Sequence, residues 1–210
     1  MTEMWGMWES EGVCAMDYLD KQVLEFRKSA KKSRYNSIET GMYIKDRLVH
    51  FEKVHVLDGK VSILLPEGFV DMLSETARIK YPSEQRPQEI MTSDDGTVNF
   101  TFSLFEADFN EGQIEDALGQ FKAVIRKVNP AFIFYDFVVE TDKALGWFDF
   151  KSYGLDEQIY NVMYITPVNG KLMHGIFNCL YRDILEWKEP VHQVMMSVTD
   201  LTQGEEQTTI

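Results

Sequence analysis

The segment Val54-His55-Val56-Leu57-Asp58-Gly59-Lys60-Val61-Ser62-Ile63-Leu64-Leu65 carries the clearest fold signal in the chain, because two apolar runs flank an Asp-Gly pair. Alternation of this kind is typical of a strand with one buried face. Asp-Gly favours a type I′ turn, since both turn residues need positive φ. A two-residue loop pairs Val56 with Val61 and Val54 with Ile63. We therefore expect an antiparallel hairpin with one apolar face.

Residues downstream of the hairpin predict further strands and one long helix. An irregular stretch, residues 66–92, includes a short helical turn and ends in a short strand, and apolar and polar residues then alternate over 97–104. This alternation predicts a half-buried strand with one polar face. A helix follows over 110–128, because Asn110 and Gln113 form a capping box and an apolar stripe continues at helical spacing.

Four strands are then expected in succession, over residues 132–140, 145–151, 158–166 and 171–181. The first is apolar on both faces apart from Asp136, which predicts a central strand covered on both sides. A tight turn at Asn169-Gly170 places Asn161 opposite Asn178. Together with the hairpin, these strands predict an antiparallel sheet.

Helices are expected at both ends of the chain. Apolar residues recur at helical spacing from Met16 to Arg34, and the end of this helix is basic. A C-terminal helix is expected near Pro190, a residue suited to the first helical turn. The expected organisation is an N-terminal helical extension (1–45), an antiparallel-sheet α/β domain (46–198) and a disordered tail (199–210).

Composition and charge favour a single folded domain and argue against nucleic acid as a partner. The 210 residues are 44% hydrophobic, which is enough for a sizeable core, and the net charge is −13. Residues 1–60 carry ten Lys/Arg and ten Asp/Glu, whereas residues 61–210 carry eleven Lys/Arg against twenty-four Asp/Glu. A body this acidic would be repelled by a phosphate backbone.

The cysteines and the N-terminus favour a cytoplasmic location. Cys14 and Cys179 are two lone thiols far apart in sequence, which fits a reducing compartment better than a disulfide framework. Residues 1–12 lack the basic region and apolar core of a secretory signal. No stretch approaches the roughly 20 apolar residues that span a bilayer. We expect neither a secreted nor an integral membrane protein.

The phrase Val61-Ser62-Ile63-Leu64-Leu65-Pro66-Glu67-Gly68-Phe69, with the order of the expected elements, gives the chain a family resemblance. An apolar strand that runs into a Pro-Glu-Gly-Phe corner resembles the PsbP-like superfamily, including its DcrB-like bacterial branch, over residues 50–198. The resemblance implies an α+β fold: an α/β/α sandwich around a mainly antiparallel sheet, here with an added N-terminal helix. The family offers no shared catalytic motif that could be assigned to this chain, and the resemblance implies a binding role, because members mostly bind other proteins and some DcrB-like ones are chaperones of secreted bacterial effectors.

The sequence contains no recognisable catalytic, cofactor-binding or metal-binding motif. His50 and His55 are five residues apart and point to opposite faces of a strand, so they do not converge on a metal ion. His174 and Cys179 also face opposite ways, which favours a buried structural thiol over a nucleophile. We therefore expect a non-enzymatic protein with no cofactor and no metal.

Four polar residues on the sheet form the candidate ligand-binding site: Asp149, Asn161, His174 and Asn178. On an otherwise apolar face they would make the floor of a small polar pocket. The alternative, which we favour, is that the two asparagines form a cross-strand amide pair that fixes the strand register.

A second set of residues forms the candidate partner-binding surface, and it combines aromatic side chains with the basic end of the N-terminal helix. It comprises Trp5, Trp8, Arg27, Lys28, Lys31, Lys32, Trp147 and Phe150. Strand aromatics usually pack in a core, but aromatics left uncovered would make a hydrophobic protein-binding surface. The basic cluster would contact an acidic partner or membrane surface, or is simply a solvated helix end.

Three functions stay open at this point. The preferred one is a non-enzymatic protein-binding module of a bacterial cell, adaptor or chaperone-like, because catalytic motifs are absent and aromatic residues are abundant. The second is a small-ligand-binding or enzymatic domain that uses the polar patch. The third is a structural homo-oligomer in which Trp5, Trp8 and the N-terminal helix pack against a neighbouring copy.

Overall fold

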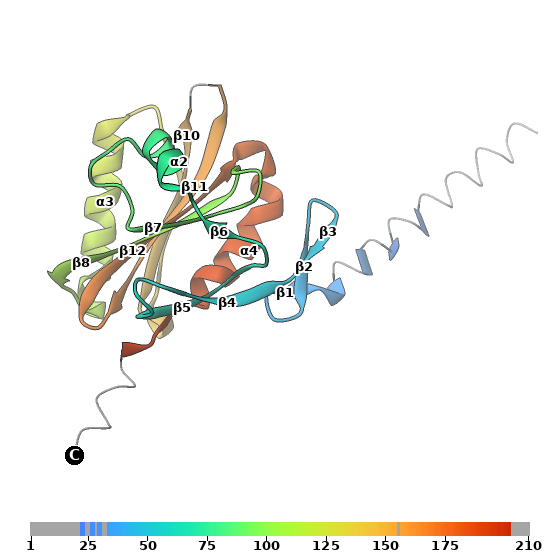
Figure 1. The fold of residues 1–210 in the computed structure, drawn as a ribbon, viewed down its shortest axis with the longest axis horizontal. Helices are drawn as coiled ribbons and strands as arrows, with labels where there is room; N and C mark the ends of the chain where they lie inside the picture. The colour runs from blue at the N-terminus through green and yellow to red at the C-terminus, as the bar shows by residue number, and fades with distance from the viewer. Residues whose placement is uncertain (1–21, 24–25, 28, 31–32, 155, 203–210) are drawn as a thin grey trace, which may run out of the picture.

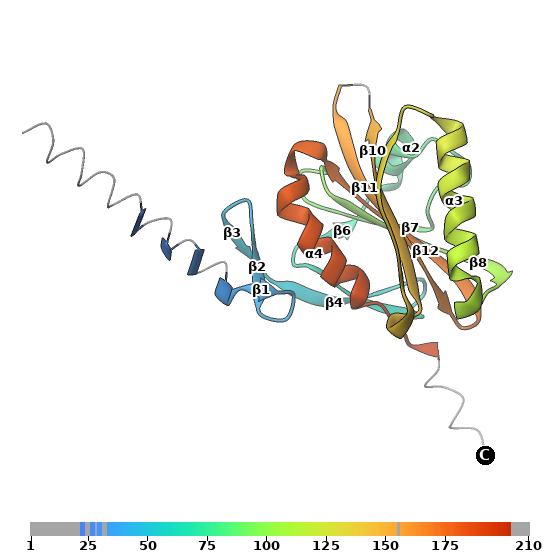
Figure 2. The ribbon, with the colours of Figure 1, turned by 180° about the vertical axis from the view of Figure 1, so that it is seen from behind.

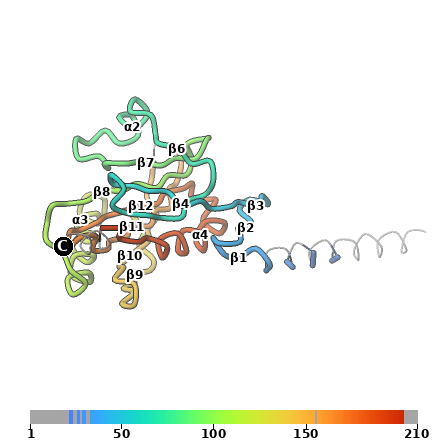
Figure 3. Tube along the Cα trace, turned by 60° about the horizontal axis from the view of Figure 1, so that its bottom comes forward, coloured from blue at the N-terminus to red at the C-terminus, as the bar shows by residue number. Residues whose placement is uncertain are grey.

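Seven antiparallel strands form the main sheet, in the order β6-β7-β8-β12-β11-β10-β9. The computed structural model describes residues 22–23, 26–27, 29–30, 33–154 and 156–202. The strands are β6 (Val70–Asp71), β7 (Glu89–Thr92), β8 (Asn99–Asp108), β9 (Ile133–Glu140), β10 (Leu145–Tyr153), β11 (Gln158–Val168) and β12 (Lys171–Leu180). Figure 3 shows β6 and β7 at one end of the molecule and β9 and β10 at the other.

Helices cover the two faces of this sheet. Helix α3 (Ile114–Val128) lies on one face and helix α4 (Ile184–Met196) on the other, as Figures 1 and 2 show from opposite sides. A small second sheet, in the order β13-β5-β4, shares the α4 side. The apolar core is accordingly split into a larger cluster on the α4 side and a smaller one under α3. The expected α+β fold, a sandwich around an antiparallel sheet, is confirmed.

The Asp-Gly hairpin forms as predicted from strands β4 (Phe51–Val56) and β5 (Val61–Pro66). Val56 pairs with Val61 and Val54 with Ile63. The turn has positive φ at Asp58 (57°) and Gly59 (78°) and is closed by a hydrogen bond from Lys60 N to Leu57 O of 3.2 Å. Strand β13 (Thr199–Asp200) then adds to β5, so residues 199 and 200 belong to the folded body, not to a disordered tail; residues 203–210 lie outside the described part.

The helix and strands of the middle of the chain also form where the sequence predicts them. The capping box of Asn110 and Gln113 is present and forms a 3-10 turn that leads into α3. The short helical turn of the irregular stretch is α2 (Ser74–Lys80), and its final strand is β7. The prediction that one face of β8 is polar and exposed to solvent is wrong at the start of the strand, because Asn99 and Thr101 are only 2% and 1% exposed. The side chain of Asn99 forms hydrogen bonds with Thr92 of β7 and Asn178 of β12, so the polar groups on this face are buried between neighbouring strands.

Strands before residue 50 correct the expected helical extension of residues 1–45. Strands β1 (Asn36–Ser37), β2 (Gly41–Ile44) and β3 (Arg47–Val49) form a three-stranded meander. The β2–β3 turn places Lys45 and Asp46 at positive φ without a glycine, so it lacked the usual sequence signal. Ile38, Met42 and Ile44 of this segment join the α4-side core. The described residues between 22 and 34 are helical and exposed, and the rest of the predicted N-terminal helix lies outside the described residues.

Helix α4 corrects the expected position of Pro190. The helix begins at Ile184, after a 3-10 turn at Tyr181–Asp183, so Pro190 lies inside it and not in its first turn. An internal proline removes one backbone hydrogen bond. The ring is buried together with Trp187 and Val191, and this apolar packing offsets the loss.

Among the described helices, none is long and apolar enough to cross a membrane.

Strand β9 is an edge strand, which corrects the prediction that residues 132–140 form a central strand covered on both sides. Among the strands that the structure describes, its only neighbour in the sheet is β10. A bulge places Tyr135 and Asp136 opposite the single residue Asp149, so the alternation of side chains shifts by one along the strand. An apolar pattern on both faces had suggested full burial, yet Ile133, Tyr135 and Phe137 are exposed.

Candidate functional site

The four residues of the predicted polar patch do not share one face of the sheet. Asn161 and His174 point to the α3 side, because they alternate in register with residues of the smaller core cluster. Asn178 lies opposite Asn161, as predicted. Asp149 lies between Phe148 and Phe150, which belong to the α3-side cluster, and it therefore points to the α4 side. These side chains cannot form one common pocket floor.

Each asparagine amide is satisfied by a neighbour other than its cross-strand partner. Asn161 Nδ2 donates to Ser152 Oγ at 2.9 Å. Asn178 Oδ1 accepts from Asn99 Nδ2 at 2.8 Å, and Asn178 Nδ2 donates to the Tyr81 hydroxyl at 3.1 Å. The two amides therefore belong to separate hydrogen-bond networks that link strands β8 to β12 and β10 to β11.

His174 is packed against aromatic rings beneath α3. Its ring stacks on Phe121 with a centroid distance of 5.3 Å and an interplanar angle of 6°. Burial lowers the pKa of His174 to about 4, so the imidazole is neutral near pH 7. A neutral ring stacked under a helix and only partly exposed is a packing residue in this arrangement.

Asp149 is fully buried and ties the bulge of β9 to the rest of the sheet. Its Oδ1 accepts from the backbone N of Asp136 at 2.7 Å, and its Oδ2 accepts from the Tyr160 hydroxyl at 2.9 Å. Burial, together with the neighbouring Asp149, raises the pKa of Tyr160. Lys188 of α4 lies 2.8 Å from the Asp136 carboxylate and 3.7 Å from that of Asp149. The Asp149 carboxylate thus accepts a hydrogen bond from the backbone amide of Asp136, which the bulge leaves without a partner in the strand ladder.

The β9 edge, defined as Ile133, Tyr135 and Phe137, is an exposed apolar edge of the sheet, with Phe137 on the α3 side and Ile133 and Tyr135 on the α4 side. The three side chains are 42%, 40% and 36% exposed. Cations of α3 lie over two rings of this strand: Lys122 Nζ lies 5.1 Å from the ring centroid of Phe137, and Arg126 Cζ lies 5.1 Å from that of Phe134. The Tyr135 hydroxyl lies 3.0 Å from that of Tyr181. Sequence reasoning missed this edge because it assigned the strand to the centre of the sheet.

The residues predicted to bind a partner fall into three groups. Trp147 and Phe150 are buried, with 8% and 6% of their surface exposed, so neither is available to a partner as the chain is folded. Arg27 is exposed and helical. The remaining five, Trp5, Trp8, Lys28, Lys31 and Lys32, lie outside the described residues, and their role stays a prediction.

Cys179 and His174 do not form a nucleophile–base pair, the catalytic arrangement considered in the sequence analysis. Cys179 is fully buried in the α4-side cluster, and burial raises the pKa of its thiol to about 12. His174 lies on the other face, as the five-residue spacing predicts. Within the described part of the chain, no group of three or more His, Cys, Asp or Glu residues is placed to hold a metal ion.

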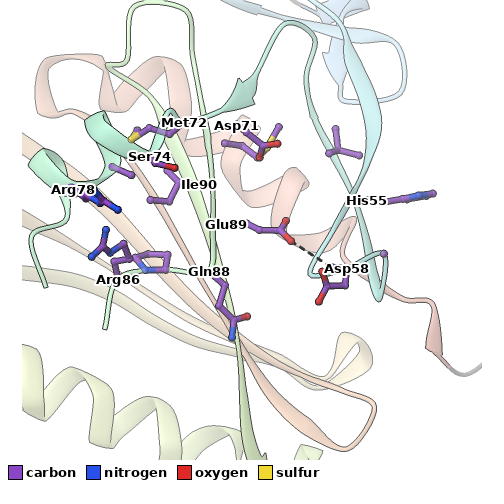
Figure 4. A pocket seen from close by; sticks show the side chains of 15 residues that line it. His55, Asp58, Asp71, Met72, Ser74, Arg78, Arg86, Gln88, Glu89 and Ile90 are labelled. Atoms are coloured by element: carbon purple, nitrogen blue, oxygen red, sulfur yellow. Dashed lines mark hydrogen bonds between the residues drawn. The ribbon is translucent and has the colours of Figure 1, made fainter. Parts of the chain in front are cut away.

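A pocket of about 610 Å³ lies between the β4–β5 turn, the β6–α2 corner and β7. In Figure 4, Arg78 and Arg86 lie on one wall, and Glu89 and Asp58 lie across from them, joined by a hydrogen bond. Ile90 and Met91 are buried apolar residues of the lining, and as consecutive residues of β7 they point to opposite sides of the strand. Sequence reasoning missed this pocket because its walls come from three segments, two of them in the irregular stretch 66–92.

Comparisons with known proteins support the fold. No family model matches the chain, and no curated protein matches it. Among solved structures, cyanobacterial PsbP from Synechocystis is similar at a TM-score of 0.50 with 10% identity, over 71% of this chain and 92% of that one. The Ran-binding protein Mog1p of Saccharomyces cerevisiae gives a TM-score of 0.49 with 9% identity, over 74% and 98%. The chain therefore has the PsbP-like fold, while the DcrB-like bacterial branch stays a prediction.

Proposed function

We propose that this protein is a non-enzymatic protein-binding module, adaptor or chaperone-like, of the bacterial cytoplasm, and that it docks an extended apolar segment of its partner along the β9 edge. The observation that carries the proposal is the exposure of Ile133, Tyr135 and Phe137 on a strand with only one neighbour. An unpaired strand edge offers backbone hydrogen bonds, and aromatic side chains supply most of the binding energy of typical interfaces.

The bulge defines where on β9 such a segment would pair. Asp149 and Lys188 hold Tyr135-Asp136 toward α4, so backbone pairing is confined to the regular stretch from Phe137 to Glu140. Apolar contact with Phe137 falls on the α3 side of the sheet, and contact with Tyr135 and Ile133, further along the strand, falls on the α4 side. This division favours a partner segment that is extended at one end and anchored by apolar side chains at the other.

The proposal is tested by the double variant Ile133→Glu/Phe137→Glu. A glutamate at 133 faces Lys151 across the strand pair, and one at 137 comes close to Lys122. The fold should therefore tolerate both, while apolar contact with a partner is lost. We expect affinity capture from the source organism to recover a stoichiometric partner with the wild-type protein and to lose it with the double variant.

The matched control is Leu185→Glu, which places the same charge on an 88% exposed apolar residue of α4. This control should retain the partner. Hydrogen exchange of residues 133–140 should also slow in the purified complex. Equal capture by the double variant, or no stoichiometric partner for the wild type, would contradict the proposal.

A further inference from the structure

We propose that the pocket between the β4–β5 turn, α2 and β7 binds a small molecule through an oxyanion, a carboxylate or a phosphate group, held by Arg78 and Arg86. The site is separate from the β9 edge, which lies at the other end of the sheet. The proposal therefore stands or falls independently of the protein-binding role.

The pocket has the size of a ligand site. Its volume of about 610 Å³ falls within the range of roughly 300–1,000 Å³ typical of small-molecule pockets. Ala77, Ile90 and Met91 are buried apolar residues in its lining, and Ser74 and Gln88 add polar groups. Polar and charged residues make up about half of the lining, more than is usual for such sites, which suits a charged ligand.

The side chains of the two arginines have no carboxylate partner, a state that they share with most of the described cations. Lys45, Lys171, Arg182 and Lys188 all form ion pairs with carboxylates. Neither the guanidinium group of Arg78 nor that of Arg86 forms a hydrogen bond or an ion pair with any residue that the structure describes, although the chain carries a net charge of −13. Two guanidinium groups on one wall repel each other, and a planar oxyanion matches the fork of each.

The acidic residues of the pocket are arranged so that they do not neutralise this wall. Glu89 Oε1 accepts from the backbone N of Leu57 at 2.7 Å and of Asp58 at 3.4 Å, which holds its carboxylate against the β4–β5 turn. Asp58 and Asp71 also line the pocket, away from the arginine wall in Figure 4. His55 points away from the pocket. The pocket is therefore polarised around the edge of β7: the arginines lie on the side to which Ile90 points, and Glu89 and Asp58 lie on the other side.

This polarity specifies the orientation and chemistry of the ligand. Its oxyanion lies at the arginine wall, where charge-assisted hydrogen bonds are strongest. The other end carries hydrogen-bond donors, which meet Asp58, Asp71 and the remaining lone pairs of Glu89. A small molecule with an anionic head and a donor-bearing tail fits both walls.

The test is a titration of the full chain with inorganic phosphate and, separately, with succinate, followed by calorimetry and by the NMR signals of the arginine Nε–H groups. We expect at least one probe to shift the signals of Arg78 and Arg86 and to bind more weakly as NaCl is raised. The double variant Arg78→Gln/Arg86→Gln should weaken binding by about tenfold or more, because each arginine makes charged hydrogen bonds. The stronger of the two probes identifies the class of oxyanion.

The matched control is Arg47→Gln on β3, an exposed arginine that does not line the pocket. It should bind both probes as the wild type does, and all variants should melt at similar temperatures because the arginines hold no other residue. Equal binding by the double variant would overturn the proposal. So would the failure of both probes to shift the arginine signals of the wild-type protein at millimolar concentration.

Discussion

Gly175 shows at the scale of a single residue how closely the sheet is packed. A Cβ atom added at Gly175 would lie 2.1 Å from Cζ of Tyr164, whose ring covers the glycine from the neighbouring strand and is fully buried. We expect Gly175→Ala to lower the free energy of unfolding by about 1–3 kcal/mol or more, because the buried ring has no room to move. Denaturant unfolding measures this change.

Gly119 is the matched control for that substitution. It lies inside α3, and an added Cβ would meet nothing within 4 Å. Gly119→Ala should therefore raise the free energy of unfolding by about 0.5–1 kcal/mol, since alanine loses less conformational entropy in a helix. A Gly175→Ala protein as stable as the wild type would mean that the Tyr164 ring is not held where the structure places it.

Between elements, Gln193 of α4 joins the N-terminal meander to the body. Its Oε1 accepts from Ile38 N at 3.1 Å, and its Nε2 donates to Asn36 O at 2.9 Å. We expect Gln193→Ala to speed amide hydrogen exchange over residues 36–49, because two backbone groups lose their partners, and to cost about 1–2 kcal/mol of stability. The exposed Gln120 of α3 supplies the control, since Gln120→Ala should leave that exchange unchanged. Unaltered exchange in Gln193→Ala would show that apolar packing alone holds the meander.

The same elements show which structural features a sequence can predict. The β4–β5 hairpin and α3 were predictable because each has a local cause, an Asp-Gly turn and a capping box. The β2–β3 hairpin was missed because Lys45-Asp46 adopts its turn without glycine. The position of β9 at the edge of the sheet could not be predicted, because it depends on the strand order, and pairing between residues far apart in sequence determines that order. The candidate sites were missed for the same reason, since the pocket joins three distant segments and β9 was assigned to the centre of the sheet.

For the whole molecule, charge decides whether the β9 edge is free to pair with a second copy. Residues 61–210 carry twenty-four Asp/Glu against eleven Lys/Arg, so two bodies brought edge to edge repel each other within the Debye length of roughly 8 Å at physiological salt. We expect light scattering at that salt to give the monomer mass of 24.4 kDa. A dimer mass that returns to the monomer value in Ile133→Glu/Phe137→Glu would instead make the edge a self-association surface. A dimer that persists in this variant would place the interface elsewhere and would favour the alternative interface through Trp5, Trp8 and the N-terminal helix.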